Sequence, residues 1–142
     1  MGWEHAYNGS GSKMKFHIIL DIEPTGKGRP RFTRTGHAFT PAKTRKVEDN
    51  IKQLVRNIYR SEPYEGPVTA SYRMIFKRPK SNKTPEHVQR PDADNCAKLV
   101  QDAMNGIIYR DDCQIVAFDV TKEWGATSKI IVDIWSLDES PD

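Results

Sequence analysis

The acidic side chains between Asp92 and Val116 are the residues whose types and spacing best support chemistry. This stretch reads DADNCAKLVQDAMNGIIYRDDCQIV and carries Asp92, Asp94, Asp111 and Asp112 around a short helical pattern. Carboxylates this close repel one another, so a fold keeps them together mainly when a positive charge lies between them. Hard oxygen ligands favour Mg²⁺ or Mn²⁺, and no His or Cys cluster competes for a softer metal. We therefore expect the four aspartates to hold Mg²⁺, with Mn²⁺ as a substitute, at a site of phosphodiester chemistry.

A helical pattern follows the first two aspartates and places a lysine beside them. In an extended Asp92-x-Asp94 segment both carboxylates point to one side, and a helix that starts there adds partial positive charge. We expect Asp94 to be the N-cap of a helix over residues 94–105. Lys98 lies one turn beyond Asp94 on the same face, so its ammonium can offset the carboxylates or a phosphate.

Asp112 reaches this cluster only if the chain turns back after the helix. A helix over residues 94–105 is about 18 Å long at 1.5 Å per residue. The connection over residues 106–112 extends roughly 23 Å at 3.3 Å per residue. Asp112 can therefore return to the helix start, or it can reach a neighbouring subunit instead. The alternative to a metal site is that the aspartates only cap a helix and a turn.

Basic residues dominate the chain before the acidic cluster. Residues 1–91 hold 18 Lys and Arg against 8 Asp and Glu, whereas residues 92–142 hold 4 against 11. A basic region beside an acidic cluster fits a polyanion-binding surface around a metal-dependent centre. The alternative is a solvated surface on which the charges segregate without function.

Two short basic segments are the candidates for DNA contacts. The first is interleaved with glycines, which let a backbone approach phosphates closely. The second opens a predicted helix, where positive charge is unfavourable against the helix dipole unless it meets an anion. The predicted contacts are Lys27, Arg29, Arg31 and Arg34 in the first segment and Lys43, Arg45 and Lys46 in the second. Solvated side chains are the alternative for both segments.

Alternating apolar residues predict strands, and apolar residues at helical spacing predict helices. We expect strands near residues 15–23, 68–76, 116–120 and 130–134, helices over 41–60 and 94–105, and a basic hairpin that turns at Gly36. This order predicts an α+β fold: a two-layer α/β sandwich with a small mixed sheet and two main helices.

The chain has the length of one domain, 142 residues. We expect a flexible lead-in over residues 1–13, a folded domain over 14–136 and a frayed tail over 137–142. The start lacks the basic and apolar regions of a signal peptide, and no apolar run approaches the roughly 20 residues that span a bilayer. Two cysteines favour reduced thiols. The expected location is therefore the cytoplasm, without a membrane partner.

The segment RPDADNCAKLVQDAMNGIIYRDDCQIV, residues 90–116, resembles the core motif of the RusA family of Holliday junction resolvases. That motif is close to R-x-D-x-D-N-x-x-K, a helix and then D-D-x-Q, and a looser match over residues 24–31 is similar to prophage members. The resemblance implies a RusA-like fold and a small homodimer that cleaves four-way DNA junctions symmetrically with Mg²⁺ or Mn²⁺. It assigns essential roles to Asp92, Asp94, Lys98 and Asp112, with Asp111 beside them.

Phosphoryl-transfer chemistry suggests what each group does. The aspartates would hold one or two ions that activate water and stabilise the leaving oxygen, and Lys98 would contact the scissile phosphate. Asn95 either orients a metal-bound water or is structural, and Gln114 serves strand packing or hydrogen bonding. Trp124 and Trp135 lie in predicted strands, where core burial and a subunit interface both explain them.

Three functions are compatible with this sequence. The first is the resolution of four-way junctions by paired cleavage in recombination and repair. The second is a non-catalytic DNA-binding accessory role, with a metal site that is structural or lost. The third is a nuclease that acts on other branched DNA, such as flaps or forks. The intact set of Asp92, Asp94, Lys98 and Asp112 favours a nuclease over an accessory protein.

Overall fold

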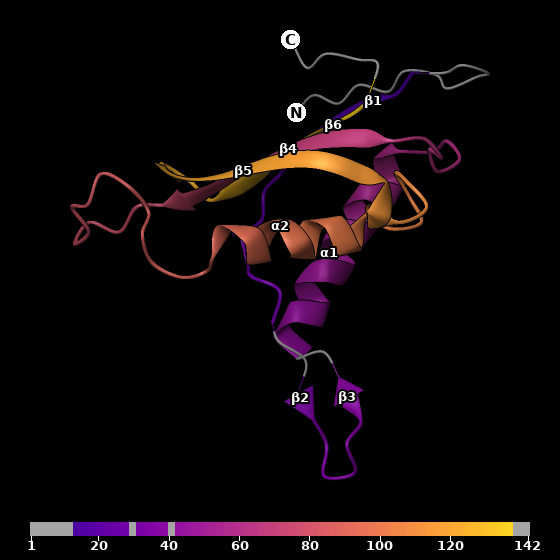
Figure 1. Cartoon of the computed structure of the whole chain (residues 1–142). Helices are drawn as coiled ribbons and strands as arrows, with labels where there is room; N and C mark the ends of the chain where they lie inside the picture. The colour runs from indigo at the N-terminus through magenta and orange to yellow at the C-terminus, as the bar shows by residue number, and fades with distance from the viewer. Residues whose placement is uncertain (1–12, 29–30, 40–41, 138–142) are drawn as a thin grey trace.

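A four-stranded sheet with two helices against one face forms the body of the protein (Figure 1). The computed structural model describes residues 13–28, 31–39 and 42–137. The sheet contains β1 (Lys15–Leu20), β4 (Val68–Lys77), β5 (Ile115–Gly125) and β6 (Lys129–Ser136), and the helices are α1 (Ala42–Ile58) and α2 (Ala93–Ala103). A separate hairpin pairs β2 (Arg31–Phe32) with β3 (Ala38–Phe39), and a short 3₁₀ helix, η1 (Asp112–Gln114), precedes β5. The expected α+β fold is confirmed.

The strand order β1-β6-β4-β5 makes the sheet mixed. β6 runs antiparallel to both β1 and β4, whereas β5 runs parallel to β4. Parallel neighbours need a crossover connection, and here the crossover carries α2. The topology therefore places α2, with the acidic residues at both of its ends, directly against the sheet.

One face of the sheet forms the core together with the two helices. Buried and partly exposed residues alternate along β1, β4 and β6, as the period of a half-buried strand requires. From the helices, Ile51, Val55, Leu99 and Val100 complete this core with at most 1% of their surface exposed. Each fully buried side chain of this size contributes about 1.5–3 kcal/mol, so the position of α2 is fixed by packing rather than by its charges.

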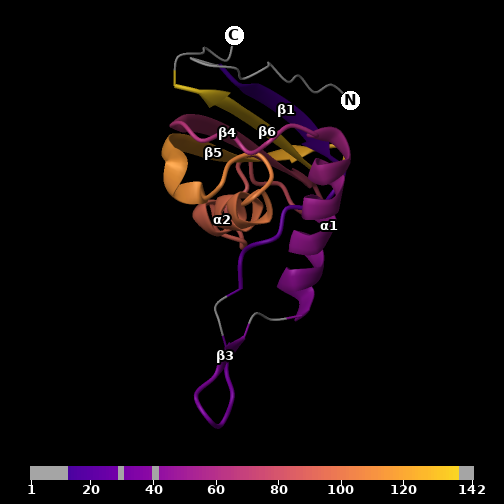
Figure 2. The same cartoon turned by 90° about the vertical axis from the view of Figure 1, so that its right-hand side faces the viewer.

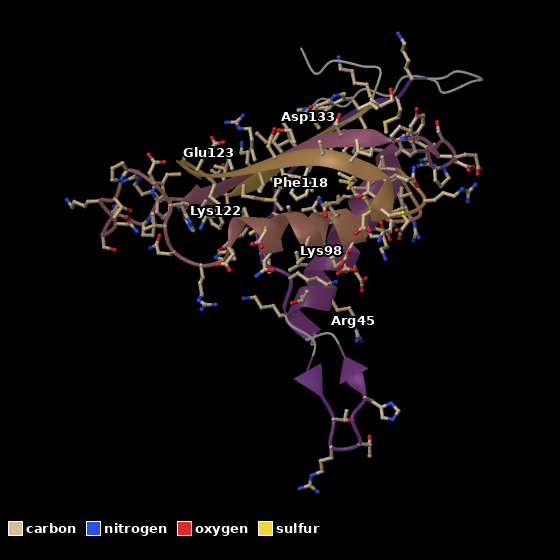
Figure 3. The ribbon with its side chains drawn as sticks, viewed as in Figure 1. Arg45, Lys98, Phe118, Lys122, Glu123 and Asp133 are labelled. Atoms are coloured by element: carbon tan, nitrogen blue, oxygen red, sulfur yellow. The ribbon has the colours of Figure 1, made fainter. Side chains whose placement is uncertain are left out.

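The opposite face of the sheet carries polar pairs instead of helices. Arg73 and Glu123 form a two-bond ion pair with distances of 2.9 Å across β4 and β5. Asp133 accepts a hydrogen bond of 2.6 Å from His17. Asp133 and Glu123 lie on this side in Figure 3, whereas Lys98 and Arg45 lie on the helical side.

The hairpin β2–β3 projects from the helical side, away from the sheet, in both views (Figures 1 and 2). Gly36, with φ of 86°, forms its turn as expected, because this backbone conformation favours glycine. Pro41, which was expected to open α1, lies outside the described residues, as do most of the expected lead-in and tail. Neither helix in the described part of the chain has the length and apolar character needed to cross a bilayer.

Candidate active site on helix α2

The first two aspartates lie at the N-terminus of α2. Asp92 is the N-cap, with an extended backbone at φ −70° and ψ 146°, and the helix begins at Ala93. The prediction that Asp94 is the N-cap was therefore wrong: Asp94 lies in the first turn, and its carboxylate accepts a hydrogen bond of 2.9 Å from the backbone N–H of Asn95. Both aspartates are exposed beside the partial positive charge of the helix start.

The second pair of aspartates is held by η1 and by Gln114. Asp111 caps η1 and accepts a hydrogen bond of 3.1 Å from Cys113 N–H, and hydrogen bonding from Cys113 lowers the pKa of Asp111. Gln114 Nε2 donates to the carbonyls of Tyr64 and Gly66, at 2.8 and 2.9 Å. Gln114 Oε1 accepts from Asp111 N–H at 3.1 Å. Gln114 thus fixes the turn that presents this pair, which confirms its predicted hydrogen-bonding role.

Asp112 returns to α2 within the same chain. Its Oδ2 lies 3.1 Å from Lys98 Nζ, and only 19% of its side chain is exposed. Lys98 also lies 3.2 Å from Asp102 Oδ1, one turn further along the helix. The hydrogen bond to Asp112, followed by the one to Asp102, raises the pKa of Lys98. Lys98 is therefore a firmly charged ammonium between two carboxylates.

Asp102 is the site residue that the sequence interpretation missed. Its Oδ2 lies 3.0 Å from Lys27 Nζ, and Lys27 is also 2.7 Å from Glu48 Oε1 on α1. Burial alone would raise the pKa of Asp102, but hydrogen bonds from Lys27 and Lys98 hold it below the ordinary value. The spacing of four residues between Lys98 and Asp102 is a signal that could have identified half of this network.

Lys27 was predicted to contact DNA, and the structure places its ammonium in these two ion pairs. Burial acts to lower the pKa of Lys27, but the hydrogen bonds to Glu48 and Asp102 outweigh burial, and the pKa is raised. About a quarter of the side chain, 24%, is exposed. Lys27 is therefore charged and engaged between α1 and α2, and its DNA contact stays a prediction.

The backbone around Lys27 packs tightly on the start of α2. Lys27 N–H donates to the carbonyl of Asn95 at 3.0 Å, and Gly28 N–H donates to Thr44 Oγ1 at 3.3 Å. A Cβ added at Gly26 would lie 3.1 Å from Pro91 Cβ, so glycine allows this close approach. The segment joins the N-terminal ends of α1 and α2.

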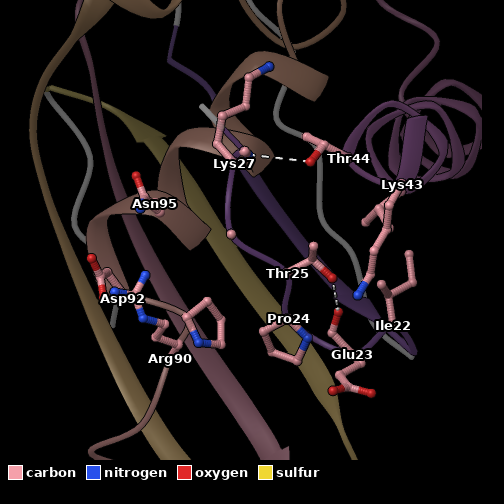
Figure 4. A pocket seen from close by; sticks show the side chains of 14 residues that line it. Ile22, Glu23, Pro24, Thr25, Lys27, Lys43, Thr44, Arg90, Asp92 and Asn95 are labelled. Carbon is pink, nitrogen blue, oxygen red and sulfur yellow. Dashed lines mark hydrogen bonds between the residues drawn. The ribbon is translucent and has the colours of Figure 1, made fainter. Parts of the chain in front are cut away.

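A pocket of about 820 Å³ opens beside this segment (Figure 4). Asp92 and Asn95 line it from α2, Lys43 and Thr44 from α1, and Arg90 from the loop before α2. Figure 4 shows Lys43 and Arg90 on opposite sides of the Pro24–Thr25 backbone. The lining therefore combines the predicted cation ligand Asp92 and a second carboxylate, Glu23, with the basic residues Lys27, Lys43 and Arg90.

The proline-containing loop before Asp92 is anchored to the end of β5. Lys122 Nζ donates to the carbonyls of Gln89 and Pro91, at 2.7 and 3.0 Å. His87 is buried, stacks on Phe76 with 3.8 Å between ring centroids, and also contacts Trp124 at 4.6 Å. These contacts support core packing for Trp124, and they fix the backbone that leads into the acidic motif.

The remaining predicted DNA contacts belong to the hairpin segment and to the start of α1. Arg31 belongs to β2, Arg34 is exposed in the hairpin turn, and Arg29 lies outside the described residues. The first two turns of α1 expose Lys43, Arg45 and Lys46. Figure 3 shows Arg45 beyond Lys98 in the direction of the hairpin. Their role in binding stays a prediction.

The donor chemistry of the aspartates fits a hard divalent cation, since all four supply carboxylate oxygens. In the described residues, however, no group of three or more Asp, Glu, His or Cys side chains is arranged to hold one. Asp112 is instead engaged by Lys98. The four-aspartate metal site stays a prediction, and the cation would have to draw the carboxylates together.

Comparisons with known proteins cover the acidic motif and most of the sequence around it. Residues 21–135 match the family model described as endodeoxyribonuclease RusA. A Bacillus subtilis (strain 168) protein described as uncharacterized protein YqaN is 34% identical over 128 residues, covering 79% of this chain and 89% of that protein. Since the matched residues include both helices, the hairpin and the whole acidic cluster, the chain belongs to the RusA family of endodeoxyribonucleases.

Proposed function

We propose that this protein is a Mg²⁺-dependent endonuclease that binds four-way DNA junctions and resolves them by paired phosphodiester cleavage. The observation that carries the proposal is the approach of Asp112 Oδ2 to within 3.1 Å of Lys98 Nζ. This contact brings Asp112, from the second pair of aspartates, against α2, the helix that begins at the first pair, Asp92 and Asp94. Carboxylates and an ammonium on one side of a protein are groups that phosphoryl transfer uses.

Each group has a task within this proposal. Asp92, Asp94, Asp111 and Asp112 would hold the cation, which when bound supplies an activated water and stabilises the leaving oxygen. Lys98 places a fixed positive charge where negative charge develops on the scissile phosphate. The basic side chains of the hairpin and of α1 bind the DNA backbone beside the cluster.

Paired cleavage also leads us to propose a homodimer. Two cuts related by a two-fold axis need two acidic clusters, and a C2 dimer supplies the second one. β5 is an edge strand of the sheet, next to β4. Its side chains Val116 and Phe118 are 57% and 47% exposed. A long edge strand with exposed apolar side chains favours pairing with another chain. We therefore place the partner against β5.

The test compares a labelled immobile four-way junction with a flap, a fork and a linear duplex of the same sequence. With Mg²⁺, the wild type should cut the junction symmetrically in opposite strands and leave the linear duplex intact. EDTA should stop the cleavage. Full activity without divalent ions would contradict the metal requirement. Preferential cutting of flaps or forks would show that these structures, and not the four-way junction, are the substrate.

Charge-removing variants test the site itself. Asp92→Asn or Asp94→Asn should abolish cleavage and leave junction affinity unchanged or higher, because the change removes no phosphate contact. The matched control is Asp133→Asn, which removes a carboxylate from the opposite face of the sheet and should cleave like the wild type. If Asp92→Asn or Asp94→Asn cleaves at the wild-type rate, that aspartate is not part of the active site.

A further inference from the structure

Asp102 holds two ammonium groups that come from distant parts of the chain. Its Oδ1 lies 3.2 Å from Lys98 Nζ and its Oδ2 lies 3.0 Å from Lys27 Nζ. Only 18% of its side chain is exposed, the same fraction as for Glu48, which binds the other side of Lys27. The four groups alternate in sign, so the network is a chain of attractions that runs from α1 to the exposed end of Lys98.

Lys98 needs a fixed partner to stay in one place. Its side chain is 52% exposed and has several rotatable bonds, and a single exposed ion pair contributes only about 0–1 kcal/mol. Asp112 is a poor permanent partner in the proposed reaction, because its oxygens would also be needed to hold the cation. Asp102 has no such second task, and Lys27 holds its other oxygen.

We propose that Asp102 is a positioning residue: it keeps the Lys98 ammonium beside the scissile phosphate while Asp112 holds the cation, and Lys27 with Glu48 keeps Asp102 in place. The inference rests on the proposed function, because it assumes that Lys98 acts on the phosphate. It assigns no contact between Asp102 and DNA. Asp102 therefore influences the rate of cleavage and not the affinity for the junction.

The variant Asp102→Asn retains the size of the side chain and removes its charge. Under single-turnover conditions with saturating protein, cleavage should slow by about tenfold or more, since misplacing a catalytic group by about 1 Å can cost 100-fold. Junction affinity should stay within about threefold of the wild type or increase, because one negative charge is lost. Asp133→Asn is the control for the removal of a carboxylate.

A double-mutant cycle separates positioning from a general effect on folding. If Asp102 acts through Lys98, Asp102→Asn should change the residual rate of a Lys98→Met protein by less than about twofold, because neighbouring effects on one group are not additive. An equal loss in both backgrounds would show that Asp102 supports the fold and would overturn the inference. Wild-type cleavage by a folded Asp102→Asn protein would also overturn it.

A second variant covers the case in which Asp102→Asn fails to fold. Asp102→Glu retains the charge, and with it the attraction to Lys27, but it moves the carboxylate by one methylene. It should fold, bind the junction normally and cleave more slowly, and cleavage at the wild-type rate would refute positioning. If the wild type cleaves no branched DNA, the proposed function fails and the inference falls with it. If the wild type cleaves the junction and both Asp102 variants cleave it at the same rate, the positioning role of Asp102 is wrong while the proposed function stands.

Discussion

Replacing Lys27 by methionine tests the ion pairs that join α1 to α2. Lys27 Nζ lies 2.7 Å from Glu48 and 3.0 Å from Asp102, and all three side chains are at least three-quarters buried. A hydrogen bond to a charged group contributes about 1.5–3 kcal/mol, and removing one partner from a buried pair costs about 3–5 kcal/mol. Asp102 retains Lys98, so the main loss is the unpaired Glu48. We expect the free energy of unfolding to fall by about 2–3 kcal/mol.

Urea unfolding and thermal unfolding measure this loss. For a domain of this size the melting temperature should fall by roughly 8 °C. Lys46→Met is the matched control: Lys46 is exposed on α1 and forms no ion pair with the described residues, so its change should stay within about 0.5 kcal/mol. Equal stability of the two variants would refute the proposed contribution of the ion pairs.

The stability difference between the wild type and Lys27→Met should depend on pH in a way that follows from the pKa shifts of Asp102 and Lys27. The pKa of Asp102 is lowered, so its contribution is present above the ordinary carboxyl pKa and is lost as the pH falls through the lowered value. The pKa of Lys27 is raised, so its contribution is present below the ordinary lysine pKa and is lost as the pH rises through the raised value. The stability difference between wild type and Lys27→Met should therefore be constant from about pH 5 to pH 9 and shrink below about pH 4. A steady drift across the neutral range would contradict this account.

Three further predictions concern DNA binding, assembly and the loop before the active site. Arg31→Ala with Arg34→Ala should weaken junction binding and flatten its salt dependence by about 0.9 in log–log slope for each lost phosphate contact; an unchanged slope would place the hairpin off the DNA. Light scattering should give twice the chain mass of 16.2 kDa, and a monomer both alone and on the junction would contradict paired resolution. Lys122→Met, which frees the carbonyls of Gln89 and Pro91, should slow cleavage more than it weakens binding; an unchanged rate would show that the loop keeps its position without Lys122.

The helices and the strands β1, β4 and β6 were predictable because each one buries a single face, whereas β5 has no fully buried residue and was expected only near residues 116–120. Alternation along residues 15–20, 68–77 and 129–136 follows the sheet directly. The expected N-cap was misplaced by two residues, since Asp92 and Asp94 are both good N-cap residues and only the backbone conformation selects Asp92. The parallel pairing of β4 and β5 follows from the crossover through α2, which local patterns do not specify.

The candidate site was predictable where its residues are close in the sequence. Lys98 and Asp112 are separated by at most one helix and one turn, so the return of the chain to α2 could be expected from spacing, whereas the four-aspartate metal site stays a prediction. Lys27 differs, because its two partners lie on α1 and α2, 21 and 75 positions further along the chain. A lysine in a basic, glycine-rich segment has the same local pattern whether it contacts phosphate, solvent or a distant carboxylate. The ion pair of Asp102 with Lys27 was missed for the same reason, whereas the pair of Asp102 with Lys98 had a local signal in their spacing of four residues.

The segment around Lys27 contacts α2 and precedes the hairpin in the chain. Its backbone donates to Asn95 at 3.0 Å, close to Asp92 and Asp94, while its side chain reaches Asp102 near the other end of the same helix. A few residues later the chain enters β2, which projects away from the sheet (Figure 2). DNA held by the hairpin would therefore be attached to α2 through two contacts on a helix that the core keeps in place. Under the proposed function, such an arrangement would hold the scissile phosphate near the carboxylates, which is the condition for a positioned ammonium to act on it.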